Sequence, residues 1–461
     1  MSLKRLTIVI ACMGLLLSPV IFAQSGADEF IPNSMSHFRF NFINPGARAT
    51  AMGGAFIAQG NDATGSETNP AGLLFIPRPM VFAEYRFFRY TADRAYSATD
   101  TAVLNRKFTD DVNSLTFVSI VFPMKNWAFA IYRQELANFK AHYSSESFLV
   151  PNPPPNTIVW TWNRQAIDLD FKLVNYGFTV ARRLHETLAV GASVRIAHMS
   201  FGGNELVNFN DPPPLIDPLV SADSANNIGN YWHMGDSDNK VSFTAGLQFK
   251  PNDYLSIGAV YRYGAKHELK TTFMGNVRYF DPSTGDYVYL AQTYNNFKID
   301  VPDRFGVGVS LTPTDRFTLN MDVVRITYTD LNDQFRAVLN QSYSESPFTD
   351  PADDPARYFG WKDGTEFRIG GEYVFPFGRT DSLALRAGYY RAPDPSIHYL
   401  GGAPAASALL YNITFPPLKV DHHATFGLGM VIFRNLQIDL AGDLARDRDC
   451  FAVSVMYNFG R

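Results

Sequence analysis

Apolar and polar residues alternate with a period of two along most of the chain from about residue 78 onward. In the final segment, one side carries Phe451, Val453, Val455, Tyr457 and Phe459, and the other carries Cys450, Ala452, Ser454, Met456 and Asn458. Similar alternation occupies residues 188–196, 305–311, 367–375 and 436–441. Because successive side chains of a β-strand point to opposite faces, the pattern predicts strands with one apolar face and one face of small or polar residues.

Short turns and long polar stretches follow one another between these predicted strands. The tight connections lie at residues 123–126, 182–186, 251–253, 313–315, 378–381 and 433–435, and the long polar stretches at 91–111, 142–163, 203–239, 332–363 and 392–419. A soluble sandwich also alternates, but short turns at one rim and long loops at the other are typical of bacterial outer-membrane barrels. Residues 254–301 fit one long hairpin, and two shorter strands also fit.

The expected fold is therefore all-β: a transmembrane antiparallel β-barrel of about 14 strands, an even number as in single-chain bacterial barrels, over residues 78–461. Composition agrees with contact between a β protein and lipid, because the chain has 38 Phe and 23 Tyr but only 18% charged residues. The formal net charge of −4 gives no basic excess, which argues against a nucleic-acid partner.

The N-terminus has the layout of a secretory signal peptide over residues 1–23. Lys4 and Arg5 precede an uncharged apolar run, residues 6–22, which ends at Ala23 before Gln24. A membrane anchor is the alternative, but the run is at the lower edge of the length that spans a bilayer. Together with a barrel, a cleaved signal peptide predicts the cell outer membrane of a Gram-negative-type bacterium.

Residues 24–77 do not alternate and are rich in small residues, among them Gly53 and Gly54, followed by the stretch Asn69-Pro70-Ala71. More than fifty residues ahead of the first strand exceed what a barrel needs. We expect them to form an N-terminal hatch, or plug, inside the lumen, because small residues let backbones pack closely there.

Three segments resemble the FadL/TodX family of outer-membrane transporters of hydrophobic compounds: residues 46–56 (GARATAMGGAF), 61–64 (NDAT) and 69–73 (NPAGL). Residues 367–373 and 385–389 are similar to that family's C-terminal strands. The resemblance implies a fourteen-stranded barrel with an N-terminal hatch, and passive, hatch-gated uptake of long-chain fatty acids or other hydrophobic compounds.

By the same resemblance, Asn69, Pro70 and Ala71 belong to the gate, and we expect Gly53 and Gly54 to belong to it as well. Similar motifs occur in PorV-type barrels, which serve protein secretion or surface attachment. That second class of function stays open at this point.

Candidate ligand contacts come from two groups of residues. The aromatic residues Phe139, Phe148, Trp160 and Trp162, predicted to lie in or near long loops, either line a capture groove or serve loop packing and membrane anchoring. Among the arginines on the lumen side of their strands (Arg195, Arg262, Arg368 and Arg386), Arg386 is the candidate for a ligand carboxylate. The alternative, which we favour, is a ladder of ion pairs with Glu372, Asp322 and Asp439.

The C-terminal residues Tyr457 and Phe459 resemble the aromatic signal that delivers barrels to their insertion machinery, although Gly460 and Arg461 extend beyond it. Catalysis is not expected, because no nucleophile elbow or nucleotide-binding loop occurs in the sequence. His422 and His423 are adjacent, so in a strand they point to opposite faces and cannot share a metal. The expected partners are hydrophobic small molecules, outer-membrane lipid and the insertion machinery, with no metal and no cofactor.

Overall fold

The computed structural model describes residues 40, 42, 44–99, 102–150, 160–162, 164–208, 229–281, 286–289, 293–332, 355–403, 408, 411–413, 415–416 and 419–459. The predicted signal peptide lies outside these residues. None of the described helices is long and apolar enough to cross a membrane.

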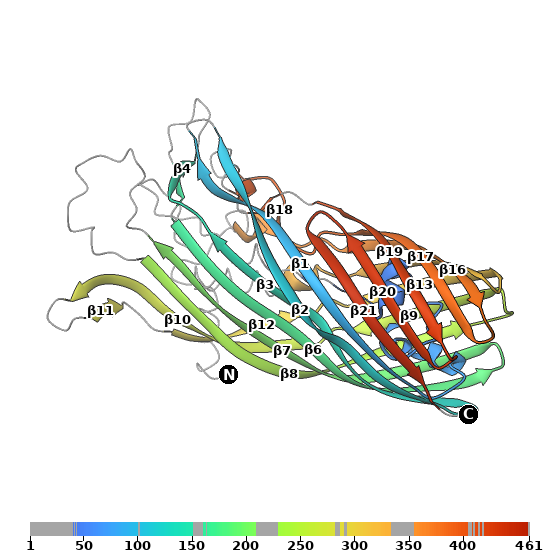
Figure 1. The fold of residues 1–461 in the computed structure, drawn as a ribbon. Coiled ribbons are helices and arrows are strands. Elements are labelled where there is room, and N and C mark those ends of the chain that lie inside the picture. Colours follow the sequence, from blue (N-terminus) through green and yellow to red (C-terminus); the bar gives the residue numbers. More distant parts are fainter. Residues whose placement is uncertain are drawn as a thin grey trace, which may run out of the picture.

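Fourteen strands form a closed antiparallel barrel in the described part of the chain (Figure 1). In order around the ring they are β1 (Met80–Ala98), β2 (Val103–Pro123), β3 (Trp127–Ser144), β6 (Arg164–His185), β7 (Leu188–Asn208), β8 (Gly229–Phe249), β9 (Leu255–Tyr263), β13 (Arg304–Thr314), β14 (Phe317–Ile326), β16 (Gly364–Phe377), β17 (Asp381–Ala392), β19 (Asp421–Ile432), β20 (Leu436–Leu444) and β21 (Arg448–Asn458). The ring closes where β1 pairs with β21, from Met80 opposite Asn458 to Tyr90 opposite Arg448. The predicted fold class and strand number are confirmed.

Smaller elements complete the description. The strands outside the ring are β4 (Phe148–Val150), β5 (Trp160–Trp162), β10 (Lys266–Asp281), β11 (Asp286–Tyr289), β12 (Thr293–Asp300), β15 (Phe359–Gly360) and β18 (His398–Tyr399). The short helices are α1 (Ala47–Ala51), α2 (Gly65–Thr68), η4 (Pro70–Phe75) and η6 (Pro355–Tyr358).

An apolar belt surrounds the barrel because the outward side chains of the strands are large and apolar. On β21, for example, Phe451, Val455 and Tyr457 are exposed, whereas Ala452 and Ser454 are buried inside. The predicted alternation of faces is confirmed. These outward side chains face lipid in an outer-membrane barrel.

One side of the barrel wall is much taller than the other. The strands β2, β6 and β7 have 21, 22 and 21 residues, whereas β14 and β20 have 10 and 9. About 9–11 residues suffice to span the bilayer. The long strands project beyond the short ones at the end opposite the C-terminus and its short turns (Figure 1). Two predicted loops are corrected accordingly: residues 91–98 and 103–111 are strand, as are 203–208 and 229–239.

The region 254–301 forms one long hairpin with an interruption, which is the first of the two readings. The part of the hairpin near the short turns is the ladder of β9 with β13, which ends at Arg262 opposite Arg304. The part farther from the short turns is the ladder of β10 with β12, which begins at Lys266 opposite Asp300. The residues between the two ladders break the regular alternation, and this is why the sequence allowed two readings.

Candidate ligand-binding lumen and plug

Residues 44–77, here called the plug, lie inside the barrel (Figure 1), and nearly every one of their side chains is buried. The helix α1 contacts β19, β20 and β21, and η4 contacts β6, β7 and β8 on the other side of the lumen. The plug therefore spans the lumen and touches both walls. Glycines of the wall allow this close approach: a Cβ atom at Gly388 of β17 would lie 2.3 Å from Gly53 N, and one at Gly246 of β8 would lie 2.2 Å from Asn69 Oδ1.

Gly53 and Gly54 form the turn that follows α1. Both have positive φ angles, +63° and +70°, which favour glycine. The amide of Gly53 donates to Thr425 Oγ1 at 2.9 Å, and the carbonyl of Gly54 accepts from Arg368 Nη1 at 3.1 Å. The turn is thus tied to β19 and β16 of the wall.

Asn69 immediately precedes η4, and Pro70 and Ala71 are its first two residues. The side-chain oxygen of Asn69 accepts from the amide of Ala71 at 3.2 Å and so caps the helix. Its Nδ2 donates to the carbonyl of Ile57 at 2.9 Å, within the plug, and to that of Leu247 on β8 at 3.1 Å. One side chain therefore links two parts of the plug and the wall.

Arg386 belongs to a buried chain of charges between plug and wall. Its guanidinium donates to Glu372 at 2.6 Å and to Asp439 at 2.8 Å. Glu372 also receives two hydrogen bonds, at 2.7 and 2.9 Å, from Arg48 of the plug. Arg386 is therefore engaged within the protein by two of the carboxylates named from the sequence.

A second charged cluster lies on the other side of the lumen, and its centre is Glu67 of α2. Arg195, Arg262 and Arg304 approach its carboxylate at 3.1, 3.4 and 3.9 Å. Burial alone would raise the pKa of Glu67, but the three arginines hold it below its ordinary value. The sequence identified Arg195 and Arg262 but not Glu67, because the plug has no periodic pattern that marks inward positions.

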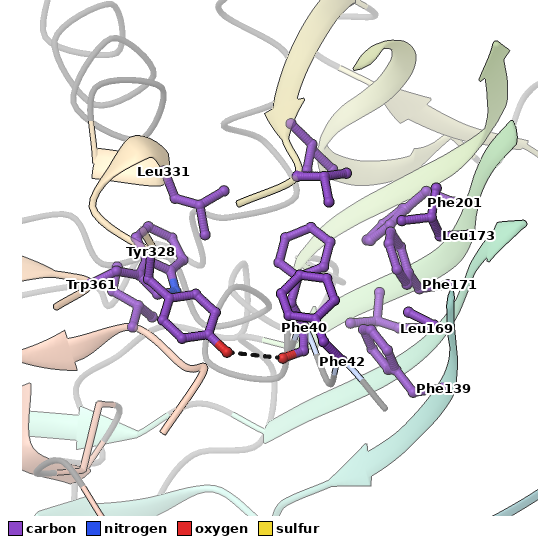
Figure 2. Close-up of a cluster of buried hydrophobic side chains, with 14 of the residues drawn as sticks. Phe40, Phe42, Phe139, Leu169, Phe171, Leu173, Phe201, Tyr328, Leu331 and Trp361 are labelled. Carbon is purple, nitrogen blue, oxygen red and sulfur yellow. Dashed lines mark hydrogen bonds between the residues drawn. The ribbon is translucent and has the colours of Figure 1, made fainter. Parts of the chain in front are cut away.

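Buried apolar side chains fill the lumen on the outer side of the plug, where the tall wall stands; we call them the lumen cluster (Figure 2). Its most prominent members are Phe40, Phe42, Phe139, Leu169, Phe171, Leu173, Phe201, Tyr328, Leu331 and Trp361. Phe40 lies between the aromatic residues of the tall wall and the pair Tyr328 and Trp361 (Figure 2). It stacks on Phe42 at 5.7 Å between ring centroids and meets Phe171 edge-on at 5.8 Å. An apolar lumen of this kind differs from the water-filled channel of a porin.

The predicted aromatic contacts lie at different places. Phe139 is on β3 rather than in a loop, and Phe148 starts β4; both side chains are buried in the lumen cluster. For Trp160 and Trp162 the structure describes the backbone of β5 alone, which pairs with β4. The sequence missed Phe171 and Phe201, since both sit on strands that continue above the apolar belt.

A small cavity lies between Phe40 and Phe42 and the strands β16, β17, β19 and β21 of the wall. Its lining includes Glu366, His423 and Arg448, so this cavity is polar on the wall side. Within the described ranges, no three His, Cys, Asp or Glu side chains come together in an arrangement suited to a metal ion.

The barrel wall is interrupted between β2 and β3. The ladder that joins them ends at Phe117 opposite Gln134. Each strand continues to pair on its other side, β2 with β1 up to Val103 and β3 with β6 up to Ser144. The break coincides with a bulge between Glu135 and Ala137, which places one extra residue, Leu136, on β3.

Side chains partly bridge this interruption. Glu135 accepts hydrogen bonds from Ser114 across the gap and from Asn138 at 2.9 Å. Leu136 and Ala137 turn inward and join the lumen cluster. The interruption therefore lies directly beside the apolar part of the lumen.

The C-terminal residues lie at the rim with the short turns. Tyr457 points outward from β21, and the amide of Phe459 donates to the carbonyl of Pro79 at 2.9 Å. The ring of Phe459 meets Phe122 edge-on at 6.1 Å.

Comparison with known proteins agrees with this architecture. The family model described as "Outer membrane protein transport protein (OMPP1/FadL/TodX)" matches residues 35–397. No curated protein matches the sequence.

Three solved structures are similar to the chain. An FadL homologue from Pseudomonas aeruginosa has a TM-score of 0.60 and 13% identity, covering 92% of this chain and 100% of the other. The P. putida toluene transporter TodX has a TM-score of 0.59 and 17% identity, with coverages of 91% and 100%. The Ralstonia pickettii toluene transporter TbuX has a TM-score of 0.54 and 15% identity, also with coverages of 91% and 100%. At these identities the structures establish the shared fold.

Proposed function

Because this chain belongs to the FadL/TodX family of outer-membrane transport proteins, we propose that it takes up hydrophobic compounds by passive, hatch-gated diffusion. Long-chain fatty acids are the first substrates that we infer. The P. putida and R. pickettii relatives are described as toluene transporters, so aromatic hydrocarbons are the second class to test. The family match does not favour a PorV-type role in secretion or surface attachment.

The lumen cluster is the observation that supports this proposal most strongly. It offers a hydrocarbon chain an apolar site inside the barrel, directly above the plug. Keeping a methylene group out of water contributes about 0.8 kcal/mol, so a sixteen-carbon tail gains roughly 10 kcal/mol in such a site. That gain is sufficient to drive capture without another energy source.

The interruption between β2 and β3 provides the proposed way out. It adjoins Leu136 and Ala137 of the lumen cluster and faces outward near the edge of the apolar belt, where Leu115 is exposed. A ligand that leaves sideways enters lipid directly and avoids crossing the water of the periplasm. The hydrogen bond from Ser114 to Glu135 across the interruption has to break for this step.

The plug provides the proposed gate. The plug is held against the wall, mostly through hydrogen bonds, by five residues: Gly53, Gly54, Asn69, Pro70 and Ala71. A ligand shifts the plug only if it binds the displaced state more tightly than the seated state. Phe40 and Phe42 occupy the apolar site in the seated state, so a hydrophobic ligand competes with them.

Uptake by cells that lack their own hydrophobe transporter tests the proposal. Cells with and without this protein are supplied with labelled hexadecanoate or labelled toluene, and surface expression is matched. We expect the protein to restore uptake of at least one of them, and the double variant Asn69→Ala, Pro70→Ala to weaken it. Asn126→Ala, in an exposed turn, serves as the matched control. Normal insertion without uptake of either compound would contradict the proposal.

A further inference from the structure

The six short turns that join strands of the ring in the described part of the chain share one composition. They connect β2 to β3, β6 to β7, β8 to β9, β13 to β14, β16 to β17 and β19 to β20, at the end that also holds the C-terminus (Figure 1). We call this end the turn rim. In or directly beside each turn, the chain has one basic residue and one large exposed apolar residue: Lys125 with Met124, Arg183 with Leu184, Lys250 with Tyr254, Arg316 with Phe317, Arg379 with Phe377, and Arg434 with Phe433.

Most of the basic groups of the turn rim have no counter-charge in the protein. Four of the six are exposed and form no ion pair within the described ranges: Lys125, Arg316, Arg379 and Arg434. The other two are engaged, since Arg183 donates to the carbonyl of Leu74 at 2.7 Å and Lys250 lies 3.6 Å from a carboxylate oxygen of Asp253. The turn rim therefore presents unpaired positive charges.

Basic side chains at the other edge of the apolar belt are arranged differently. There they pair with carboxylates: Arg89 with Asp111 at 2.8 Å, Lys140 with Asp170 at 3.3 Å, Lys266 with Asp300 at 3.6 Å, and Arg325 with Asp363 at 3.1 Å. The whole chain has a formal net charge of −4, so the unpaired groups of the turn rim do not reflect a general basic excess. The barrel thus neutralises its cations at one end and leaves them unneutralised at the other.

The turn between β19 and β20 is held in a conformation that its residues disfavour. Phe433 and Arg434 have φ angles of +53° and +61°, and they are the only residues besides glycine with a positive φ in the part of the chain that the structure describes. Such turns favour asparagine and glycine. The amide of Phe433 donates to Asp381 of β17 at 2.9 Å, yet the side chain of Phe433 remains 78% exposed. A disfavoured turn that presents an aromatic ring and a cation to the outside points to a contact beyond the protein.

A phospholipid has the chemistry that this arrangement fits. In bacterial barrels the short turns face the periplasm, so the turn rim lies at the level of the phosphate groups of the inner leaflet. Basic side chains bind phosphate oxygens through charge-assisted hydrogen bonds. The apolar residue beside each of them can enter the acyl chains, as interfacial aromatic residues do. A soluble acidic partner would use the charges but would leave the apolar residues in water.

We propose that the turn rim binds anionic phospholipids of the inner leaflet of the outer membrane. The four unpaired basic residues contact the head groups, and the neighbouring apolar residues insert among the acyl chains. In phosphatidylethanolamine an ammonium group of the lipid itself balances the phosphate, so the rim prefers phosphatidylglycerol. The proposal goes beyond hydrophobe uptake, because these lipids bind outside the barrel and do not enter the lumen.

Lipid titrations of the purified full chain in a non-ionic detergent, followed by native mass spectrometry, test the proposal. Phosphatidylglycerol is compared with phosphatidylethanolamine that has the same acyl chains. We expect wild-type protein to bind phosphatidylglycerol at least about fivefold more tightly, which is about the effect of one basic residue near an anionic surface. The rim variant loses that preference; it combines Lys125→Gln, Arg316→Gln, Arg379→Gln and Arg434→Gln.

A matched control removes the same number of charges from the other edge of the belt. It combines four substitutions of paired and exposed residues, and it retains the preference: Arg89→Gln, Lys140→Gln, Lys266→Gln and Arg325→Gln. A further variant, Phe433→Gly, suits the positive φ of the turn and therefore folds. It lowers the affinity for both lipids and leaves their ratio unchanged. If the rim variant fails to fold, Arg379→Gln with Arg434→Gln halves the change and reduces the preference.

Equal affinities of wild type for the two lipids would overturn the proposal. It would also be overturned by a preference that the rim variant retains, or by one that the control variant loses as well. Unchanged affinities in Phe433→Gly would show that its ring does not insert among acyl chains. Hydrophobe uptake does not enter these measurements, so the proposed function is tested separately.

Discussion

Asn69 uses both ends of its side-chain amide, and each end serves a different purpose. The oxygen caps η4 at the amide of Ala71, whereas the nitrogen links the plug to the carbonyl of Leu247 on the wall. A substitution that keeps one function and removes the other separates them. Serine is suitable, because it caps a helix nearly as well as asparagine but does not reach the wall.

We therefore predict different local stabilities for Asn69→Ala and Asn69→Ser. The alanine variant loses the cap, which costs about 1 kcal/mol, and the amides of residues 71–75 exchange with solvent faster. The serine variant keeps the amide of Ala71 protected and loosens the tie to β8. Hydrogen exchange followed by mass spectrometry measures both effects. Equal exchange in both variants would show that the cap does not stabilise η4.

At the residue scale, the sequence predicted which arginines face the lumen but not all of their partners. The position of a residue within an alternating strand decides whether its side chain points into the lumen or outward. Arg195 and Arg386 were therefore identified as lumen-facing residues. Arg386 meets Glu372 and Asp439, which share the same periodicity. Glu67 escaped prediction because the plug follows no repeating pattern, and its position depends on the packing of the whole lumen.

At the scale of elements, the position of the plug in the lumen depends on glycines in the strands of the wall. A Cβ atom at Gly246 would lie 2.2 Å from Asn69 Oδ1, whereas at Gly371 the nearest atoms are 3.7 Å away. We predict that Gly246→Ala displaces the plug and raises the ion conductance of the barrel in planar bilayers. Gly371→Ala, the matched control on β16, leaves the conductance low. Equal conductances in the two variants would show that Gly246 is not needed to keep the plug in position.

The bulge of β3 lies where the ladder between β2 and β3 ends. We predict that deleting Leu136, the extra residue, lets the ladder between the strands extend beyond Phe117 and Gln134 and lowers hydrophobe uptake. Leu136→Ala retains the bulge and thus most of the uptake. The assay is the cellular uptake of labelled hexadecanoate and toluene at matched surface expression. Full uptake by the deletion variant would exclude this exit.

At the scale of the whole molecule, the sequence predicted the barrel, the number of its strands and which side chains point outward. This was possible because contact with lipid imposes a strict alternation of apolar and polar residues along each strand. It did not predict the tall wall. Above the belt the outward residues become polar, as at Asp168 and Asp170 of β6, so the segments look like loops even though the strands continue. The lumen cluster is built largely on this tall wall and was therefore only partly recognised.

The whole molecule also separates two kinds of environment along its axis. Hydrogen bonds and ion pairs hold the plug toward the rim with the short turns, and apolar side chains fill the lumen above it. This arrangement leaves an apolar space between the tall wall and the plug. The proposed uptake through the lumen requires a ligand to enter that space.

Photo-labelling of the protein in cells tests whether a ligand passes through the lumen. Cells that display the protein are given hexadecanoate with a diazirine in its chain, illuminated, and the labelled peptides are identified. We predict labels on the lumen cluster, in particular near Leu136, Phe139 and Phe171, and excess unlabelled hexadecanoate suppresses them. Labels confined to outward residues of the belt, such as Val241 and Phe243, would contradict passage through the lumen.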